Sequence, residues 1–184
     1  MKKILFSILA GMAFTAVAHA QESVYPASKQ TAPIIIMNGT VHVGNGQVLN
    51  NTSVEIRDGK ITNIGAGVTA SEDAFKVDAK GKHVYPGLIL ANSNLGLVEV
   101  NSIRATIDDS EIGEYNPSVR SLVAYNTDSK IINTLKTNGI THANIVPQGG
   151  IISGSSSVVQ LDAWNWEDAA YAVDNNIFMN MPAL

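Results

Sequence analysis

Apolar and polar residues alternate along the chain from residue 33, and glycine-containing turns interrupt the alternation at short intervals. The dipeptides Asn38-Gly39 and Asp58-Gly59 are typical of type I′ hairpin turns, because both central residues of such turns need a positive φ. A further short strand is expected over Phe75 to Asp78, and no helical period of useful length occurs in this part of the chain. Residues 33–83 are therefore predicted to form a small all-β unit.

The hydrophobic pattern changes after Pro86. The stretch "GLILANSNLGL" is nearly continuously apolar, as is typical of a strand covered on both faces, and residues 101–120 are polar, acidic and without a period. A helix is then predicted to begin after a cap at Asp128 or Ser129 and to end at Asn138-Gly139, before the apolar strand "THANIVP". The order strand, helix, strand predicts a right-handed βαβ unit with parallel strands.

The first residues have the pattern of a secretory signal peptide. Lys2 and Lys3 precede an apolar run, and Ala18-His19-Ala20 matches an A-x-A cleavage site. Residues 1–20 are therefore predicted to be removed on export, which leaves a periplasmic or secreted chain without a membrane anchor. Residues 21–32 are polar, contain a proline, and are expected to form a flexible leader.

Charge and composition narrow the classes of partner. Removal of Lys2 and Lys3 lowers the 12 basic residues to 10 against 16 acidic ones, so the formal charge falls from −4 to −6. An acidic chain lacks the electrostatic footprint of a protein that binds nucleic acid or an anionic lipid surface. The chain has no cysteine, so its stability must come from a packed core without disulfides.

Two longer stretches carry a family resemblance. The segment "NGTVHVGNGQVLNNTSVEIRDGKITNIGAG", followed by "VDAKGKHVYPGLI", resembles the N-terminal part of the amidohydrolase superfamily, the metal-dependent hydrolases that include imidazolonepropionase and dihydroorotase-like enzymes. The resemblance covers residues 34 to about 97. It implies a composite fold, in which a small β-sandwich over residues 33–83 precedes the start of a TIM-type (β/α) barrel over residues 84–184.

The resemblance also locates a site. In the family the first barrel strand ends in a D-x-H-x-H pattern, whose two histidines are the first ligands of a divalent, zinc-like metal ion. The matching stretch here is Leu90-Ala91-Asn92-Ser93-Asn94, so Asn92 and Asn94 stand at both ligand positions. An amide oxygen is a weak donor that suits hard ions better than zinc. No metal and no other cofactor is therefore predicted for this chain.

The resemblance implies a hydrolase acting on carbon-nitrogen bonds of the non-peptide or cyclic amide kind, with a small-molecule substrate. A complete barrel takes roughly 250 residues, so the chain is expected to be a truncated portion that is inactive by itself. The alternative is a non-catalytic pseudo-hydrolase that binds a ligand without a metal. The sequence assigns no catalytic residue, and it leaves the oligomeric state open.

The segment "QGGIISGSSSVVQLD" is predicted to be a glycine and serine loop leading into a third strand. Loops at the carboxyl ends of barrel strands bind substrate. Ser153, Ser155 and Ser156 are therefore candidates for substrate binding, with a plain connecting loop as the alternative. A helix is expected to begin near Trp166, and the tail from Asn175 is expected to end without a final strand.

Other polar clusters have competing interpretations. The three histidines after the signal peptide are expected to be structural, because none pairs with another at metal-ligand spacing. The acidic residues between positions 108 and 114 are expected to form a solvated loop, with a hard-cation site or a contact to a cationic substrate as the alternatives. The three histidines are His42, His83 and His142. The acidic residues are Asp108, Asp109, Glu111 and Glu114.

Overall fold

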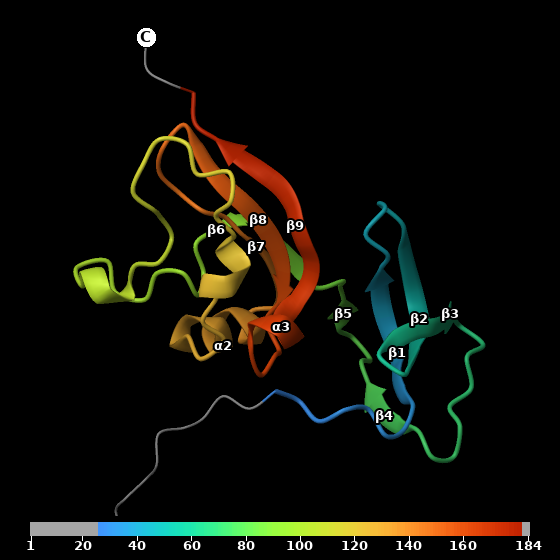
Figure 1. Ribbon diagram of the computed structural model, residues 1–184. Coiled ribbons are helices and arrows are strands. Elements are labelled where there is room, and N and C mark those ends of the chain that lie inside the picture. The colour runs from blue at the N-terminus through green and yellow to red at the C-terminus, as the bar shows by residue number, and fades with distance from the viewer. Residues whose placement is uncertain (1–25, 182–184) are drawn as a thin grey trace, which may run out of the picture.

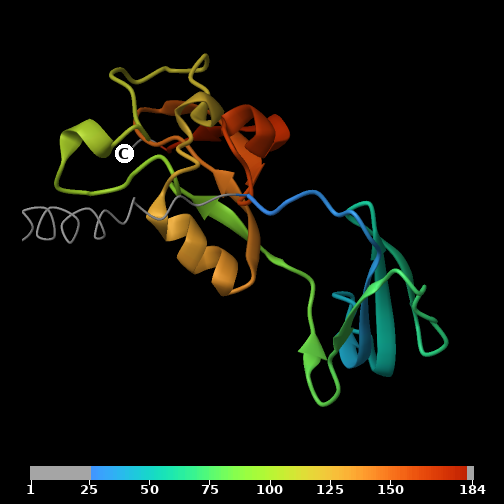
Figure 2. The ribbon, with the colours of Figure 1, turned by 90° about the horizontal axis from the view of Figure 1, so that it is seen from below.

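The computed structural model describes residues 26–181, which form two β-sheets with few helices (Figure 1). The predicted signal peptide, residues 1–20, lies outside the described residues. Within residues 26–181 no helix has the length and apolar character needed to cross a membrane. Figure 2 shows the two sheets as separate bodies that are joined through the green segment leading out of β5.

The first sheet has five strands in the order β3-β2-β1-β4, with β5 beside β1. β1 pairs antiparallel with β2, and β2 pairs antiparallel with β3. The hairpin predicted at Asp58-Gly59 is therefore present, whereas the chain turns between β1 and β2 after His42 and not at Asn38-Gly39. The expected β-sandwich is, in the described residues, this single sheet. The strands are β1 (Ile34–His42), β2 (Val48–Arg57), β3 (Lys60–Gly65), β4 (Phe75–Asp78) and β5 (His83–Val84).

One of the two predicted turns is in place and the other is not. Asp58 (φ 49°) and Gly59 (φ 70°) join β2 to β3, with the positive φ at both positions that the dipeptide predicts. Asn38-Gly39 is not a turn, because it lies inside β1 at an irregularity of the β1–β2 register. A Cβ on Gly39 would stand 3.0 Å from Cγ2 of Val84, so the glycine admits the close approach of β5.

The second sheet has four strands in the order β6-β7-β8-β9. The predicted βαβ unit is confirmed, because β6 pairs parallel with β7 and α2 lies between them in the chain. β8 and β9 are antiparallel additions, so this second sheet holds one parallel pair, and the described residues form no closed barrel. The elements are β6 (Leu88–Ser93), α2 (Lys130–Thr137), β7 (Ile140–Ile145), β8 (Ile152–Gln160) and β9 (Ala170–Met179).

The prediction that the tail ends without a final strand is wrong, since β9 pairs with β8 along its length. The helix expected near Trp166 is the short α3 (Trp166–Ala169), whose first turn is capped by the side chain of Asn165. The polar stretch before α2 contains only the 3-10 turns η2 (Arg104–Thr106) and η3 (Ser121–Ala124). Residues 170–173 are alternately half-buried and exposed in β9, but all four are apolar, so the sequence shows no strand period there.

The main core lies between α2 and the second sheet. Ile132 of α2 is 1% exposed and belongs to a cluster with Ala143 and Ile145 of β7 and Val159 of β8. Ser129 precedes the helix as predicted, but its hydroxyl donates to Oε2 of Glu99 at 2.9 Å rather than capping the helix. Burial of this apolar face is the main stabilising contribution to the sheet-helix pair.

The leader is tied to both sheets. The backbone N–H of Ala27 donates to Oδ2 of Asp162 at 2.9 Å, and Asp162 also pairs with Lys136. Burial raises the pKa of Asp162, but the hydrogen bonds from Lys136 and Ala27 outweigh it, so the pKa lies below its usual value. Gln30 donates to the carbonyl of Ile56 at 2.7 Å and accepts from the N–H of Gly59 at 2.8 Å.

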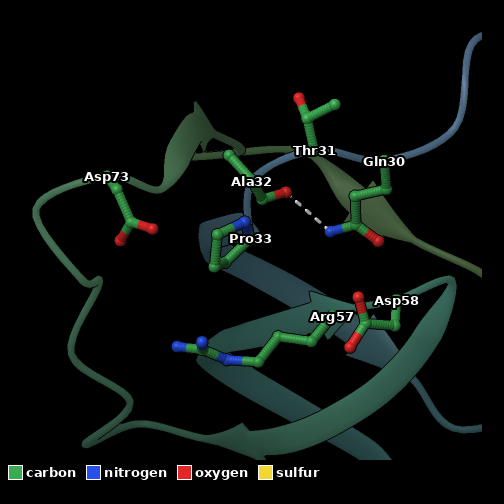
Figure 3. Close-up of a pocket in the computed structure, with 7 residues that line it drawn as sticks. All are labelled: Gln30, Thr31, Ala32, Pro33, Arg57, Asp58 and Asp73. Carbon is green, nitrogen blue, oxygen red and sulfur yellow. Dashed lines mark hydrogen bonds between the residues drawn. The ribbon is translucent and has the colours of Figure 1, made fainter.

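Figure 3 shows how Gln30 sits against the first sheet, beside Pro33, Arg57 and Asp58, where a pocket of about 130 Å³ opens. The guanidinium of Arg57 is paired with Glu55 at 2.9 Å. The pocket thus lies where residues 30–33 of the chain cross the β2–β3 hairpin. It lies on the first sheet, whereas the predicted site lies on β6 of the second.

Gly87, which directly precedes β6, is expected to tolerate no side chain. A Cβ there would stand 2.4 Å from Cγ2 and 2.5 Å from Oγ1 of Thr141 on β7. Gly87→Ala is therefore expected to lower the free energy of unfolding by about 1–3 kcal/mol, the usual cost of overpacking. Urea unfolding measures this loss.

Gly67→Ala is the matched control, because a Cβ on Gly67 meets no atom within 4 Å. Adding Thr141→Ala to Gly87→Ala should restore most of the lost stability. A Gly87→Ala chain as stable as the wild type would contradict the steric role.

Candidate functional site

The candidate site is the carboxyl end of β6, where the sequence places two asparagines. Asn92 is the penultimate residue of β6 and Asn94 follows the strand directly, and both are exposed. In a parallel β/α arrangement the carboxyl ends of strands carry the functional groups. The structure therefore presents both amides at the edge where a ligand would be bound.

The strand end is fixed by the residues that follow it. Leu95 and Leu97 are buried in the core, and the N–H of Leu97 donates to the carbonyl of Asn94 at 3.0 Å. The carbonyl of Ser93 accepts from the N–H of Val146 at 2.9 Å, which joins the ends of β6 and β7. Asn92 and Asn94 thus stand on a rigid strand end rather than on a free loop.

A tight turn at Gly96, which packs against Tyr125, follows the strand end. Gly96 has φ 71°, and a Cβ there would stand 2.6 Å from Cε2 of Tyr125. The hydroxyl of Tyr125 is buried without a hydrogen-bond partner. Its burial and the nearby Glu99 raise the pKa of Tyr125, so the phenol stays neutral throughout the physiological range.

Sequence reasoning missed a third amide beside the site. Asn144 of β7 is 8% exposed, and its Nδ2 donates to the carbonyl of Ala91 on β6 at 3.1 Å. Its Oδ1 is buried without a partner. The position of Asn144 between the apolar residues Ala143 and Ile145 was the available signal. The amide bridges the two parallel strands just before Asn92.

The residues present do not fit the zinc-like metal of the resembling family. Asn92 and Asn94 offer amide oxygens where imidazole nitrogens are needed. Over residues 26–181, no three His, Cys, Asp or Glu side chains gather in a group that would hold a metal ion. The donor set of this strand end therefore gives no transition-metal site, and no chemical step is derived through one.

The candidate serines lie in a strand, and the prediction of a loop there is wrong. Ser153, Ser155 and Ser156 belong to β8 and are buried. The hydroxyl of Ser155 donates to Oδ1 of Asp174 at 3.0 Å, while that of Ser156 has no partner. Substrate binding by these serines stays a prediction, and the described structure encloses their hydroxyls.

The acidic loop lies close to the carboxyl end of β7. Asp108, Asp109 and Glu111 line a pocket of about 250 Å³ together with Arg120 and Pro147. Asp109 accepts at its carbonyl from the N–H of Gln148 at 2.6 Å, which fastens the loop beside the strand end. Arg120 is itself paired with Asp174 at 2.7 Å. The loop thus carries its carboxylates to the same edge of the second sheet as the asparagines.

Two of the three histidines lie beside each other. Nε2 of His42 and Nδ1 of His83 lie 2.8 Å apart, although the two residues are far apart in sequence. His142 lies on β7 and contacts Tyr171 instead of another histidine. The two rings are edge to face, with a centroid distance of 4.9 Å. The fold thus brings together two histidines that have no metal-ligand spacing in the sequence, and their hydrogen bond agrees with the expected structural role.

No protein-family model matches the chain, and no curated protein sequence matches it significantly. Among solved structures, an amidohydrolase from Thermotoga maritima MSB8 superposes with a TM-score of 0.73 and 26% identity over 79% of this chain. Solved neighbours are amidohydrolases and prolidases. The chain spans 38% of the length of the Thermotoga protein. The resemblance to the amidohydrolase superfamily is thus supported at the level of structure.

Two further structures match less of the chain. A molinate hydrolase is 32% identical over 40% of this chain and 16% of its own, with a TM-score of 0.35. A prolidase complexed with N-methylphosphonate-L-proline is 20% identical over 60% of this chain and 25% of its own, with a TM-score of 0.44. Both TM-scores fall below 0.5, so neither structure supports a conclusion about this chain.

Proposed function

We propose that this chain is the N-terminal portion of an exported hydrolase of the amidohydrolase superfamily, which acts on carbon-nitrogen bonds of small amides. The observation that carries the proposal is the superposition on the Thermotoga maritima amidohydrolase, at 26% identity over 79% of the chain. The parallel β6–β7 pair and the exposed strand end after β6 agree with the start of a (β/α) barrel. The signal-peptide pattern of residues 1–20 supports export.

A second function is favoured by the asparagines themselves. Asn92 and Asn94 both donate and accept hydrogen bonds, as the C=O and N–H groups of an amide ligand require. They face outward at a strand end that is already anchored by Leu95 and Leu97. A non-catalytic protein that binds a small amide through these side chains keeps the fold and needs no metal.

Turnover and binding by the full-length protein separate the two functions. Hydrolysis of any member of a panel of N-acyl amino acids and cyclic amides supports the hydrolase. Saturable binding of such an amide without turnover supports the binding protein, and the absence of both contradicts both.

The double variant Asn92→Ala/Asn94→Ala tests the site itself. Loss of two hydrogen-bonding amides is expected to weaken binding, measured as Kd or KM, by about tenfold or more. Asn63→Ala is the control, because Asn63 is an exposed asparagine of β3 in the other sheet. Equal affinity in the double variant and the control would remove Asn92 and Asn94 from the site.

A further inference from the structure

The histidine pair lies where the first sheet passes into the second. His42 ends β1 and His83 begins β5, and the two strands pair in parallel with Thr40 opposite His83. The N–H of Thr40 donates to the carbonyl of Lys82 at 3.0 Å, which fixes this register. The ladder therefore holds the two imidazoles against each other, with Nε2 of His42 and Nδ1 of His83 at 2.8 Å.

We propose that His42 and His83 form a binding site for a divalent transition-metal ion such as Ni²⁺ or Zn²⁺. Neutral imidazole nitrogen is a preferred ligand of these ions, with metal-nitrogen distances of about 2.0–2.1 Å. Two nitrogens on one ion then stand about 3.0–3.4 Å apart for ordinary bond angles. The observed 2.8 Å is close to this separation, so a small rotation of the exposed His83 admits the ion between the rings.

A stacked tyrosine orients the pair. The ring of Tyr85 lies on that of His42 with centroids 4.1 Å apart and an interplanar angle of 12°. This stacking restricts the rotation of His42, so that one ligand of the two is already in position before the ion binds. Preorganisation of this kind lowers the entropic cost of binding.

A pocket of about 680 Å³ opens beside the pair, lined by His42, Tyr85, Pro86, Leu88 and Thr141 among others. Within the described residues no third His, Cys, Asp or Glu completes a metal cluster. The ion would therefore complete its coordination with water or with a donor atom of a small ligand, and the pocket on the His42 side has room for one. The site is separate from the strand end with Asn92 and Asn94, so it stands or falls independently of the proposed hydrolase or binding function.

Calorimetric titration of the full chain with Ni²⁺, and separately with Zn²⁺, tests the site. One ion is expected to bind per chain, and His42→Gln or His83→Gln should each weaken binding by at least about tenfold, because a chelate loses one of its two ligands. His142→Gln is the matched control and should leave the affinity unchanged, since His142 lies on β7 against Tyr171.

A second measurement needs no substitution. In nuclear magnetic resonance spectra of the wild-type chain, Ni²⁺ should broaden the ring signals of His42 and His83 together, before those of His142. No binding, binding that survives the loss of both His42 and His83, or broadening that affects His42, His83 and His142 equally would overturn the proposal.

Discussion

Replacing Gly154 with alanine is expected to lower the free energy of unfolding by about 3 kcal/mol or more, from backbone strain and overpacking together. Gly154 has φ 125°, a conformation that side chains disfavour. A Cβ there would also stand 2.5 Å from the carbonyl oxygen and 2.9 Å from Cβ of Val119. The N–H of Ser155 donates to that same carbonyl at 2.8 Å, so relief of the clash would break the contact between the loop and β8. Urea or thermal unfolding measures the loss.

Gly46→Ala separates the two contributions. Gly46 has φ 92°, yet a Cβ there meets no atom within 4 Å, so only the conformational strain of about 1 kcal/mol is expected. A Gly154→Ala chain that loses no more stability than Gly46→Ala would show that the long loop does not rest on β8 as the structure has it.

The same contact explains why residues 153–157 are glycine and serine although they form part of β8. Glycine and serine usually mark connections, but here they are small because a loop backbone crosses directly over β8. Arg120 forms an isolated bridge with Ser155, and Tyr115 forms one with Ile152. The residues that restrict side-chain size in β8 lie more than 30 positions earlier in the chain. The local sequence around residues 153–157 therefore does not reveal the contact.

The elements that could be predicted are those fixed by local chemistry. The turn at Asp58-Gly59 and the stop of α2 at Asn138-Gly139 follow from residues that adopt positive φ, as Gly139 does with φ 83°. Asn38-Gly39 is a dipeptide typical of turns, but it lies within β1. Glycine is required at position 39 by the close approach of Val84 and not by a positive φ. Tertiary contact thus overrides an otherwise reliable dipeptide signal.

The candidate site shows the same division. Asn92 and Asn94 could be placed at the end of a strand, because the apolar run before them and the family resemblance both fix that boundary. Asn144 and the His42–His83 pair depend on which strands become neighbours, and pairing between β1 and β5 joins residues some 40 positions apart. The sequence therefore predicts where a single residue such as Asn92 lies on its strand. It does not predict which side chains from different strands come into contact.

Ile132→Ala is expected to lower the free energy of unfolding by about 2–5 kcal/mol, the usual cost of removing a large buried aliphatic side chain and leaving a cavity. Ile132 is 1% exposed and joins α2 to Ala143, Ile145 and Val159 of the second sheet. Loss of this contact should loosen α2 from the parallel β6–β7 pair, and the strand end that carries Asn92 and Asn94 rests on the same core. Chemical denaturation measures the loss.

Ile131→Ala is the matched control, since the adjacent isoleucine is 45% exposed, and its truncation should change stability by no more than about 0.5 kcal/mol. The two variants remove the same atoms from neighbouring positions of one helix, so helix propensity cancels in the comparison. Equal effects of the two substitutions would mean that α2 does not pack on the sheet through Ile132, and the anchoring of the candidate site would then need another source.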